Sequence, residues 1–250
     1  MSNHLSLRSG NPVLKANTFI QRQTTIDTGT MTITGTVNKT ALGLLLLMTT
    51  AIFTWNMAPT DPRISALMMV GVFGGLIAAM ITVFKRHLAP YTTPIYALLE
   101  GLALGGISRF FETLYPGIVN QAVFLTFGTL AALLFAYQSG LIKPTENFKL
   151  GIVAATGGIF FVYIISFILG LFGVQVPLIH SNSNFGILFS FGVVVIAALN
   201  LVLDFDFIEE GAEIGAPKYM EWFGAFGLLV TLVWLYLEIL HLLAKLQSRR

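Results

Sequence analysis

Four acidic residues stand inside or at the end of long apolar runs, and they are the residues most able to do chemistry. Glu238 lies within LVWLYLEILHLL, Glu100 within YALLEGLALGGISRFF, and Asp204 and Asp206 close an apolar run in NLVLDFDFIEEGAE. An ionisable group at the centre of a membrane helix costs roughly 2.5–3.5 kcal/mol on insertion scales. These acids are therefore candidates for a proton-sensing or ion-conducting site.

Asp204 and Glu238 form the most plausible pair. They would lie on consecutive antiparallel helices, and their midpoint, residue 221, falls slightly after the turn signal Gly215-Ala216-Pro217-Lys218, a mismatch that tilt or a non-helical start to the last helix could absorb. Two carboxyl groups brought close cannot both ionise cheaply, so they would share a proton or bind a hard cation such as calcium through oxygen. Asp204 lies deeper than Asp206, whose position better suits a helix cap or an interfacial charge. We expect Glu100 to line the same cavity or to pair with a basic residue.

Other chemistries have less support. A Glu-x-x-His step, Glu238 to His241, occurs once, whereas di-iron bundles use two such steps and two further glutamates. The sequence has no cysteine and neither an HExxH nor a GxSxG motif. We therefore predict no catalytic residue, no enzyme activity and no cofactor, with calcium as a transported or bound ion. The remaining acids near the last turn are predicted to be solvated in a connecting loop: Glu209, Glu210, Glu213 and Glu221.

The composition places the chain in a lipid bilayer. Of its 250 residues, 55% are apolar and 10% are charged, against about 25% charged residues in ordinary globular domains. Such a chain cannot cover a water-exposed surface, which excludes a cytosolic enzyme, a nucleic-acid binder and a disordered regulator.

Seven apolar stretches approach the length of about 20 residues that a membrane-spanning helix needs. They are apolar on all sides rather than alternating, which excludes the strands of a membrane barrel. The prediction is an all-α polytopic protein with one bundle over residues 39–250. The expected spans are 40–57, 64–84, 93–108, 118–137, 150–173, 185–203 and 222–245.

Residues 1–38 are polar and are predicted to form a flexible N-terminal tail. If the N-terminus is cytoplasmic, nine of the 14 Lys and Arg residues fall on the cytoplasmic side and five on the other. Because cytoplasmic loops carry an excess of Lys and Arg, this distribution favours a cytoplasmic N-terminus and a C-terminus on the opposite side.

Small residues recur within the expected spans at helical spacing. The pairs Gly71-xxx-Gly75 and Gly101-xxx-Gly105 allow helix backbones to approach closely. Close packing of neighbouring helices is the interpretation that we prefer for both pairs.

The layout of seven spans, the segment LDFDFIEEG, the loop GAPKYMEW and the final WLYLEILHLL resemble the transmembrane Bax inhibitor-1 family, in its larger bacterial branch. The resemblance covers roughly residues 40 to 245, and the last two motifs are its specific part. It implies a seven-helix membrane fold whose seventh helix is central, in the bacterial inner membrane.

The resemblance also implies a function. Members of the family are described as pH-sensitive calcium leak channels, and bacterial members are linked to membrane protein quality control. An aspartate late in the sixth helix and one in an LYLD-type motif of the seventh form a proton-sensing dyad. Carried over, the second position falls on Glu238 and the first on Asp204 or Asp206. This chain departs from the pattern in having Glu at 238 and a longer loop before the last helix.

Two other functions fit the same residues. The first is a membrane regulator without transport activity that binds a protease or a stress-response partner through its N-terminal tail. The second is a secondary transporter, which predicts inverted repeats and broken helices at the membrane midplane. No half-to-half symmetry is visible in the sequence.

Overall fold

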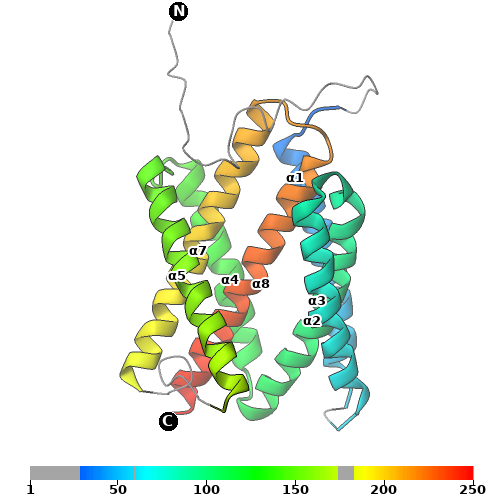
Figure 1. Ribbon diagram of the computed structural model, residues 1–250, viewed down its shortest axis with the longest axis vertical. Coiled ribbons are helices and arrows are strands. Elements are labelled where there is room, and N and C mark those ends of the chain that lie inside the picture. Colours follow the sequence, from blue (N-terminus) through cyan, green and yellow to red (C-terminus); the bar gives the residue numbers. More distant parts are fainter. Residues whose placement is uncertain (1–28, 59, 174–182, 250) are drawn as a thin grey trace, which may run out of the picture.

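The computed structural model describes residues 29–58, 60–173 and 183–249. Over these residues the chain forms one bundle of long, antiparallel helices (Figure 1). The elements are α1 (Ile33–Trp55), α2 (Arg63–Phe84), a 3-10 turn η2 (Arg86–Leu88), α3 (Ala89–Leu114), α4 (Ile118–Gln138), α5 (Glu146–Leu171), α7 (Asn184–Glu213) and α8 (Met220–Gln247).

The predicted all-α fold is confirmed over the described residues. Six of the seven long helices there are long and apolar enough to cross a membrane, so the predicted count of seven spans is not confirmed. The exception by composition is α3, which carries Glu100, Arg109 and Glu112 and has Pro94 in its interior. This helix packs extensively against α1 and α2 and touches α8. Neighbouring helices therefore cover the polar groups that lower its hydropathy.

Helix α8 is the centre of the bundle, as the sequence resemblance implied. It contacts α1, α3, α4 and α7, and it has the largest buried share of the candidate spans. Leu229, Leu235 and Leu240, spaced along its length, are fully buried. The outer helices are therefore organised around α8.

Helix α5 lies at the periphery. Only Ile152 and Ser166 along it are buried, and the helix packs mainly on α7. Large side chains such as Phe161 and Phe167, 65% and 69% exposed, face outward. Little close apolar packing therefore holds α5 to the bundle.

Glycines bring α3 against both of its neighbours. A Cβ at Gly101 would collide with the Leu47 carbonyl of α1, and one at Gly71 would lie 2.6 Å from the Leu99 carbonyl of α3. A Cβ at Gly105 would likewise collide with the backbone of α1, and one at Gly75 would lie against the Glu100 carboxylate. Both predicted small-residue pairs are therefore close-packing sites.

Helix α1 begins seven residues before the expected first span. The Thr32 hydroxyl caps it by accepting a hydrogen bond from the Gly35 amide at 3.0 Å. The preceding Met31 is buried, and its amide donates to the Ala216 carbonyl at 2.7 Å. Residues 30–38, placed in the polar tail from sequence, thus belong to the bundle, and residues 1–28 lie outside the described residues.

Helix α7 also exceeds its expected span, continuing through the acidic segment to Glu213. A short turn with Gly215 at φ 66° then leads into α8. This left-handed conformation suits glycine, which has no Cβ to clash. The acids after Asp204 consequently lie on a helix rather than in a loop.

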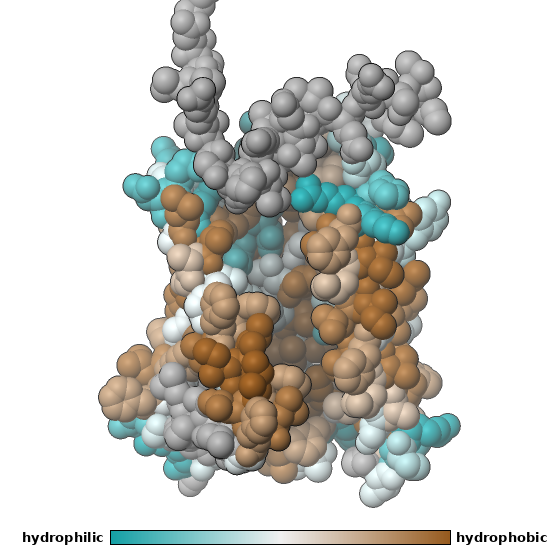
Figure 2. All heavy atoms as spheres, in the orientation of Figure 1, coloured by the Kyte–Doolittle hydropathy of each residue, from teal (hydrophilic) through white to brown (hydrophobic). Residues whose placement is uncertain are grey.

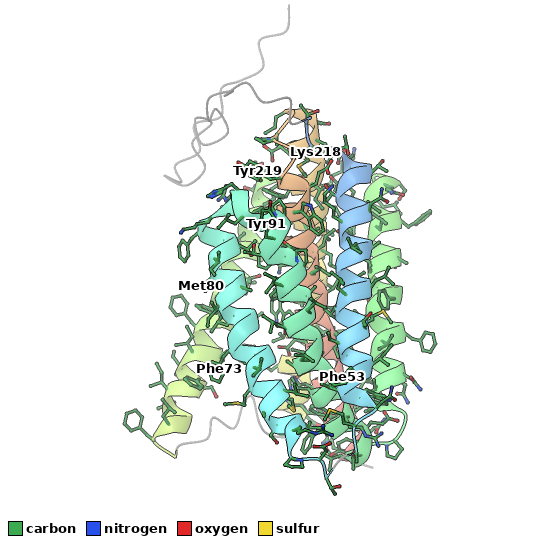
Figure 3. The ribbon with its side chains drawn as sticks, turned by 90° about the vertical axis from the view of Figure 1, so that its right-hand side faces the viewer. Phe53, Phe73, Met80, Tyr91, Lys218 and Tyr219 are labelled. Atoms are coloured by element: carbon green, nitrogen blue, oxygen red, sulfur yellow. The ribbon has the colours of Figure 1, made fainter. Side chains whose placement is uncertain are left out.

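The bundle has two polar ends and an apolar middle (Figure 2). We call the end where α1 begins and α7 meets α8 the near end, and the end where α8 finishes the far end. Figure 3 shows Phe53, Phe73 and Met80 projecting along the apolar middle, while Tyr91, Lys218 and Tyr219 lie towards the near end. This arrangement is that of a multi-pass membrane protein.

Candidate functional site

Polar contacts join α5, α7 and α8 at successive levels from the near end to the far end. We call this set the polar seam. Its members are Lys149, Thr156 and Tyr163 on α5, Ser190, Asn200, Asp204 and Asp206 on α7, and Thr231, Glu238 and Lys245 on α8. Because polar groups are expensive at membrane depth, their alignment along one three-helix interface marks the candidate site.

At the near end, α5 and α7 are joined by an ion pair. Lys149 Nζ lies 2.5 Å from Asp206 Oδ2 and 3.6 Å from Glu146 Oε1. Both members of the shorter pair are partly exposed, at 28% and 22%. Asp206 is therefore a partly exposed member of an ion pair near one end of the bundle.

Asp204 lies about half a turn deeper and faces α8. Its carboxylate lies beside the Thr231 side chain, and Oδ1 lies 3.5 Å from the position that a Cβ on Gly227 would take. Its second oxygen, Oδ2, is buried and has no hydrogen-bond partner among the described residues. A buried oxygen left unpaired is costly, and in native proteins it calls for an explanation such as a functional role.

Asn200, one turn before Asp204 and deeper in the bundle, links α7 to α5. Its amide nitrogen donates to the Thr156 hydroxyl at 2.8 Å and to the Ile196 carbonyl at 2.8 Å. Asn200 was not among the residues predicted from the sequence to do chemistry. An asparagine inside an apolar run was a signal for it, since such a side chain needs a partner in lipid.

Glu238 is buried, with 6% of its surface exposed, and faces α5. Its Oε1 accepts hydrogen bonds from the Tyr163 hydroxyl at 2.7 Å and from the Trp234 indole nitrogen at 3.1 Å. Trp234 lies one turn before Glu238, so α8 itself helps to orient the carboxyl group. Tyr163 had no sequence signal beyond its hydroxyl group in an apolar run.

Lys245 completes the seam at the far end. Its ammonium group donates to the Ser190 hydroxyl at 2.7 Å and to the Gly186 carbonyl at 3.2 Å, both on α7. Glu238, two turns earlier on the same face of α8, attracts it electrostatically.

The structure does not bring Asp204 and Glu238 together. Asp204 lies beside Thr231, which is seven residues before Glu238 on α8, or about 10 Å at 1.5 Å per residue. The two carboxyl groups contact different helices at different depths. The turn between α7 and α8 is centred near Gly215 rather than at residue 221, the midpoint of 204 and 238. Asp204 and Glu238 therefore lie at different depths in the bundle, and the expected close pair does not form in this conformation.

Glu100 is separate from the seam. Its carboxylate faces α2, where Oε2 lies 2.9 Å from the position of a Cβ on Gly75. Tyr96, one turn earlier on α3, stacks edge-on against Phe226 of α8 at 5.1 Å. Gly75 therefore leaves room for an acid between α2 and α3 rather than at the interface of α5, α7 and α8.

Glu221 was predicted to be solvated, and that prediction is wrong. Its side chain is fully buried and forms ion pairs with Lys39 of α1 and with Lys218 at 2.9 Å. It also accepts hydrogen bonds from the Thr32 amide at 2.9 Å and hydroxyl at 2.8 Å. Lys39 further lies over the Trp222 ring at 5.7 Å. We call these residues the Glu221 cluster; it fastens the start of α1 to the start of α8.

The other acids predicted in that loop behave as expected in part. Glu209, Glu210 and Glu213 are exposed, but they lie on α7. Glu209 accepts a short hydrogen bond from the Tyr137 hydroxyl of α4. These residues make the near end of α7 acidic.

Among the described residues, no cluster of three or more His, Asp or Glu side chains is arranged to hold a metal ion. His241, on the same helix face as Glu238, lies edge-on to Phe111 with ring centroids 5.4 Å apart. Any calcium bound by Asp204 or Glu238 in this conformation would need hydroxyl, amide or water oxygens as its other ligands.

Two apolar clefts lie between α1 and α4, and residues of α8 form the base of each. The cleft nearer the far end has a volume of about 310 Å³ and the other about 670 Å³. Leu44 and Leu232 line both. Glu100, Asp204 and Glu238 line neither cleft, so these cavities are separate from the three acids.

Comparison with known proteins identifies the family. No curated protein and no solved structure matches the chain. The family model described as Bax inhibitor 1 like matches residues 11–248. This match spans every described helix and confirms the resemblance seen in the last two motifs: the chain belongs to the Bax inhibitor 1 like family.

Proposed function

We propose that this protein is a pH-sensitive calcium leak channel of the bacterial inner membrane, with its N-terminus in the cytoplasm. The observation that carries the proposal is the polar seam, which joins both ends of the bundle and includes three acids. Carboxylate, hydroxyl and amide oxygens are the ligands that calcium prefers. The family membership supports the proposal.

The access route that we propose starts on the face seen in Figure 2. That face has a vertical hollow between the side formed by α5 and α7 and the side formed by α2 and α3, with α8 behind it. Asp204 lies on the α7 side of α8 and has an unpaired buried oxygen. A hydrated cation entering from the near end would meet Asp206, then Asp204, then Glu238.

Protons and calcium would compete for these carboxyl groups. A protonated Glu238 can still accept the bond from Tyr163, but it does not attract a divalent cation. Opening would require α5 to move from α7 and α8, breaking the contacts at Asn200 and Glu238. The weak apolar packing of α5 makes it the helix best suited to move.

Glu238→Gln is expected to remove most of the pH dependence of calcium flux between about pH 6 and pH 8, because the amide does not titrate in that range. The measurement is calcium entry into liposomes that contain the purified protein and a calcium dye. Glu213→Gln, an exposed acid at the near end, is the control and should retain wild-type behaviour. Unchanged flux in Glu238→Gln at every pH would end this assignment.

The competing function is a membrane regulator that binds a protease or a stress-response partner through its tail. The test is deletion of residues 1–28, which spares Met31 and Thr32 and so leaves the Glu221 cluster intact. We expect the shortened protein to keep its pH-dependent calcium flux. Loss of the cellular phenotype with flux retained would make partner binding the main function.

A further inference from the structure

The far end of the polar seam is occupied by a positive charge that belongs to the protein itself. Lys245 has its ammonium group against the Ser190 hydroxyl and the Gly186 carbonyl of α7. These are neutral oxygen donors of the kind that coordinate a metal cation. The ammonium group thus fills a place where a passing cation would find ligands.

The position of Lys245 is unusual for a lysine near the end of a membrane helix. Such side chains normally extend towards the headgroups and water. Lys245 turns inward to the first turn of α7, where the positive end of the helix dipole opposes a cation. The two hydrogen bonds and the attraction of Glu238 act against this cost.

Neighbouring charges have other partners. Arg249, one turn beyond Lys245, donates to the Asn184 side chain at 2.7 Å and is exposed. At the near end, the ammonium group of Lys149 is paired directly with Asp206. Of the described basic residues on α8, Lys245 is the one whose charge lies on the seam.

We propose that Lys245 is a tethered cation that restricts calcium passage at the far end of the polar seam. This inference rests on the proposed calcium leak. Its ammonium group occupies the oxygen ligands of Ser190 and Gly186 and repels an ion that approaches Glu238. Lys245 thus limits the rate of calcium passage and keeps the resting leak low.

Lys245→Met is expected to raise calcium flux into liposomes at a fixed pH by on the order of a hundredfold. That figure follows from removing one unit charge about 10 Å from a divalent cation at Glu238, at an effective dielectric constant of about 20. Lys245→Arg keeps the charge and should keep flux low. Arg249→Met removes the same charge one turn away and is the matched control, with flux expected to equal that of the wild type.

Lys245→Gln is the second variant, in case methionine disturbs folding, and each protein is first checked by size-exclusion chromatography. If the wild type conducts calcium with a pH response, and Lys245→Met and Lys245→Gln both show the same flux as the wild type, the inference fails while the proposed function stands. Absence of flux in every protein at every pH overturns both. Equal increases in Arg249→Met and Lys245→Met would also overturn the inference, since general surface charge would then explain them.

Discussion

Glu221→Gln is expected to destabilise the folded protein by about 3 kcal/mol. The substitution keeps the size of the side chain but removes the charge that Lys39 and Lys218 share, in a position without solvent exposure. Breaking a buried ion pair costs roughly 3–5 kcal/mol. The lower end applies because the two lysines are 20% and 48% exposed and can recover some hydration.

The measurement is the fraction of protein that stays monodisperse in detergent after heating through a series of temperatures. Glu213→Gln on α7 is the control, because that acid is exposed. Gly35→Ala tests the same cluster independently, since its Cβ would collide with the Glu221 carboxylate. Wild-type stability in both Glu221→Gln and Gly35→Ala would show that the cluster does not hold α1 to α8.

Gly105→Ala is expected to have a comparable effect through a different mechanism. The added Cβ would collide with the Ala51 carbonyl and the Thr54 hydroxyl of α1. Overpacking costs about 1–3 kcal/mol, and the upper end applies here because a backbone carbonyl cannot rotate away. Helices α1 and α3 would have to separate along one of the most extensive contacts in the bundle.

Gly128→Ala is the matched control for this substitution. It adds the same methyl group to α4, where nothing lies within 4 Å of the new Cβ. Because alanine favours helix more than glycine, this variant should be as stable as the wild type or slightly more stable. Equal heat resistance of the two variants would contradict the close approach of α1 and α3 at Gly105.

Much of the fold could be predicted because lipid imposes a simple rule on sequence. The ends of α2 and α4 lie within one residue of their expected positions, since charged or turn-forming residues flank each apolar run. The ends of α3 and α7 were underestimated. Their outer turns carry acids and prolines that hydropathy assigns to loops; on α7, Asp206 and Glu209 contact α5 and α4, while Glu213 stays exposed at the helix end.

The candidate site was predictable only in its residue types. Glu238 and Asp204 stood out because a charge inside an apolar run is costly, and both proved to be buried or to have a buried oxygen. Their partners depend on how α5, α7 and α8 are aligned along their axes, which the amino-acid sequence does not reveal. Glu221 was missed because an acid in a polar segment looks the same whether it is solvated or paired with Lys39, 182 residues away.

That separation has a consequence for biosynthesis. Lys39 lies in α1, whereas the carboxylate that neutralises it belongs to α8, which is synthesised much later. Until α8 inserts, α1 carries an uncompensated charge at the near end of the bundle, so its placement there is provisional. The joining of these two segments is therefore a late step of maturation, and a truncated chain lacking α8 should remain open to recognition by membrane proteases.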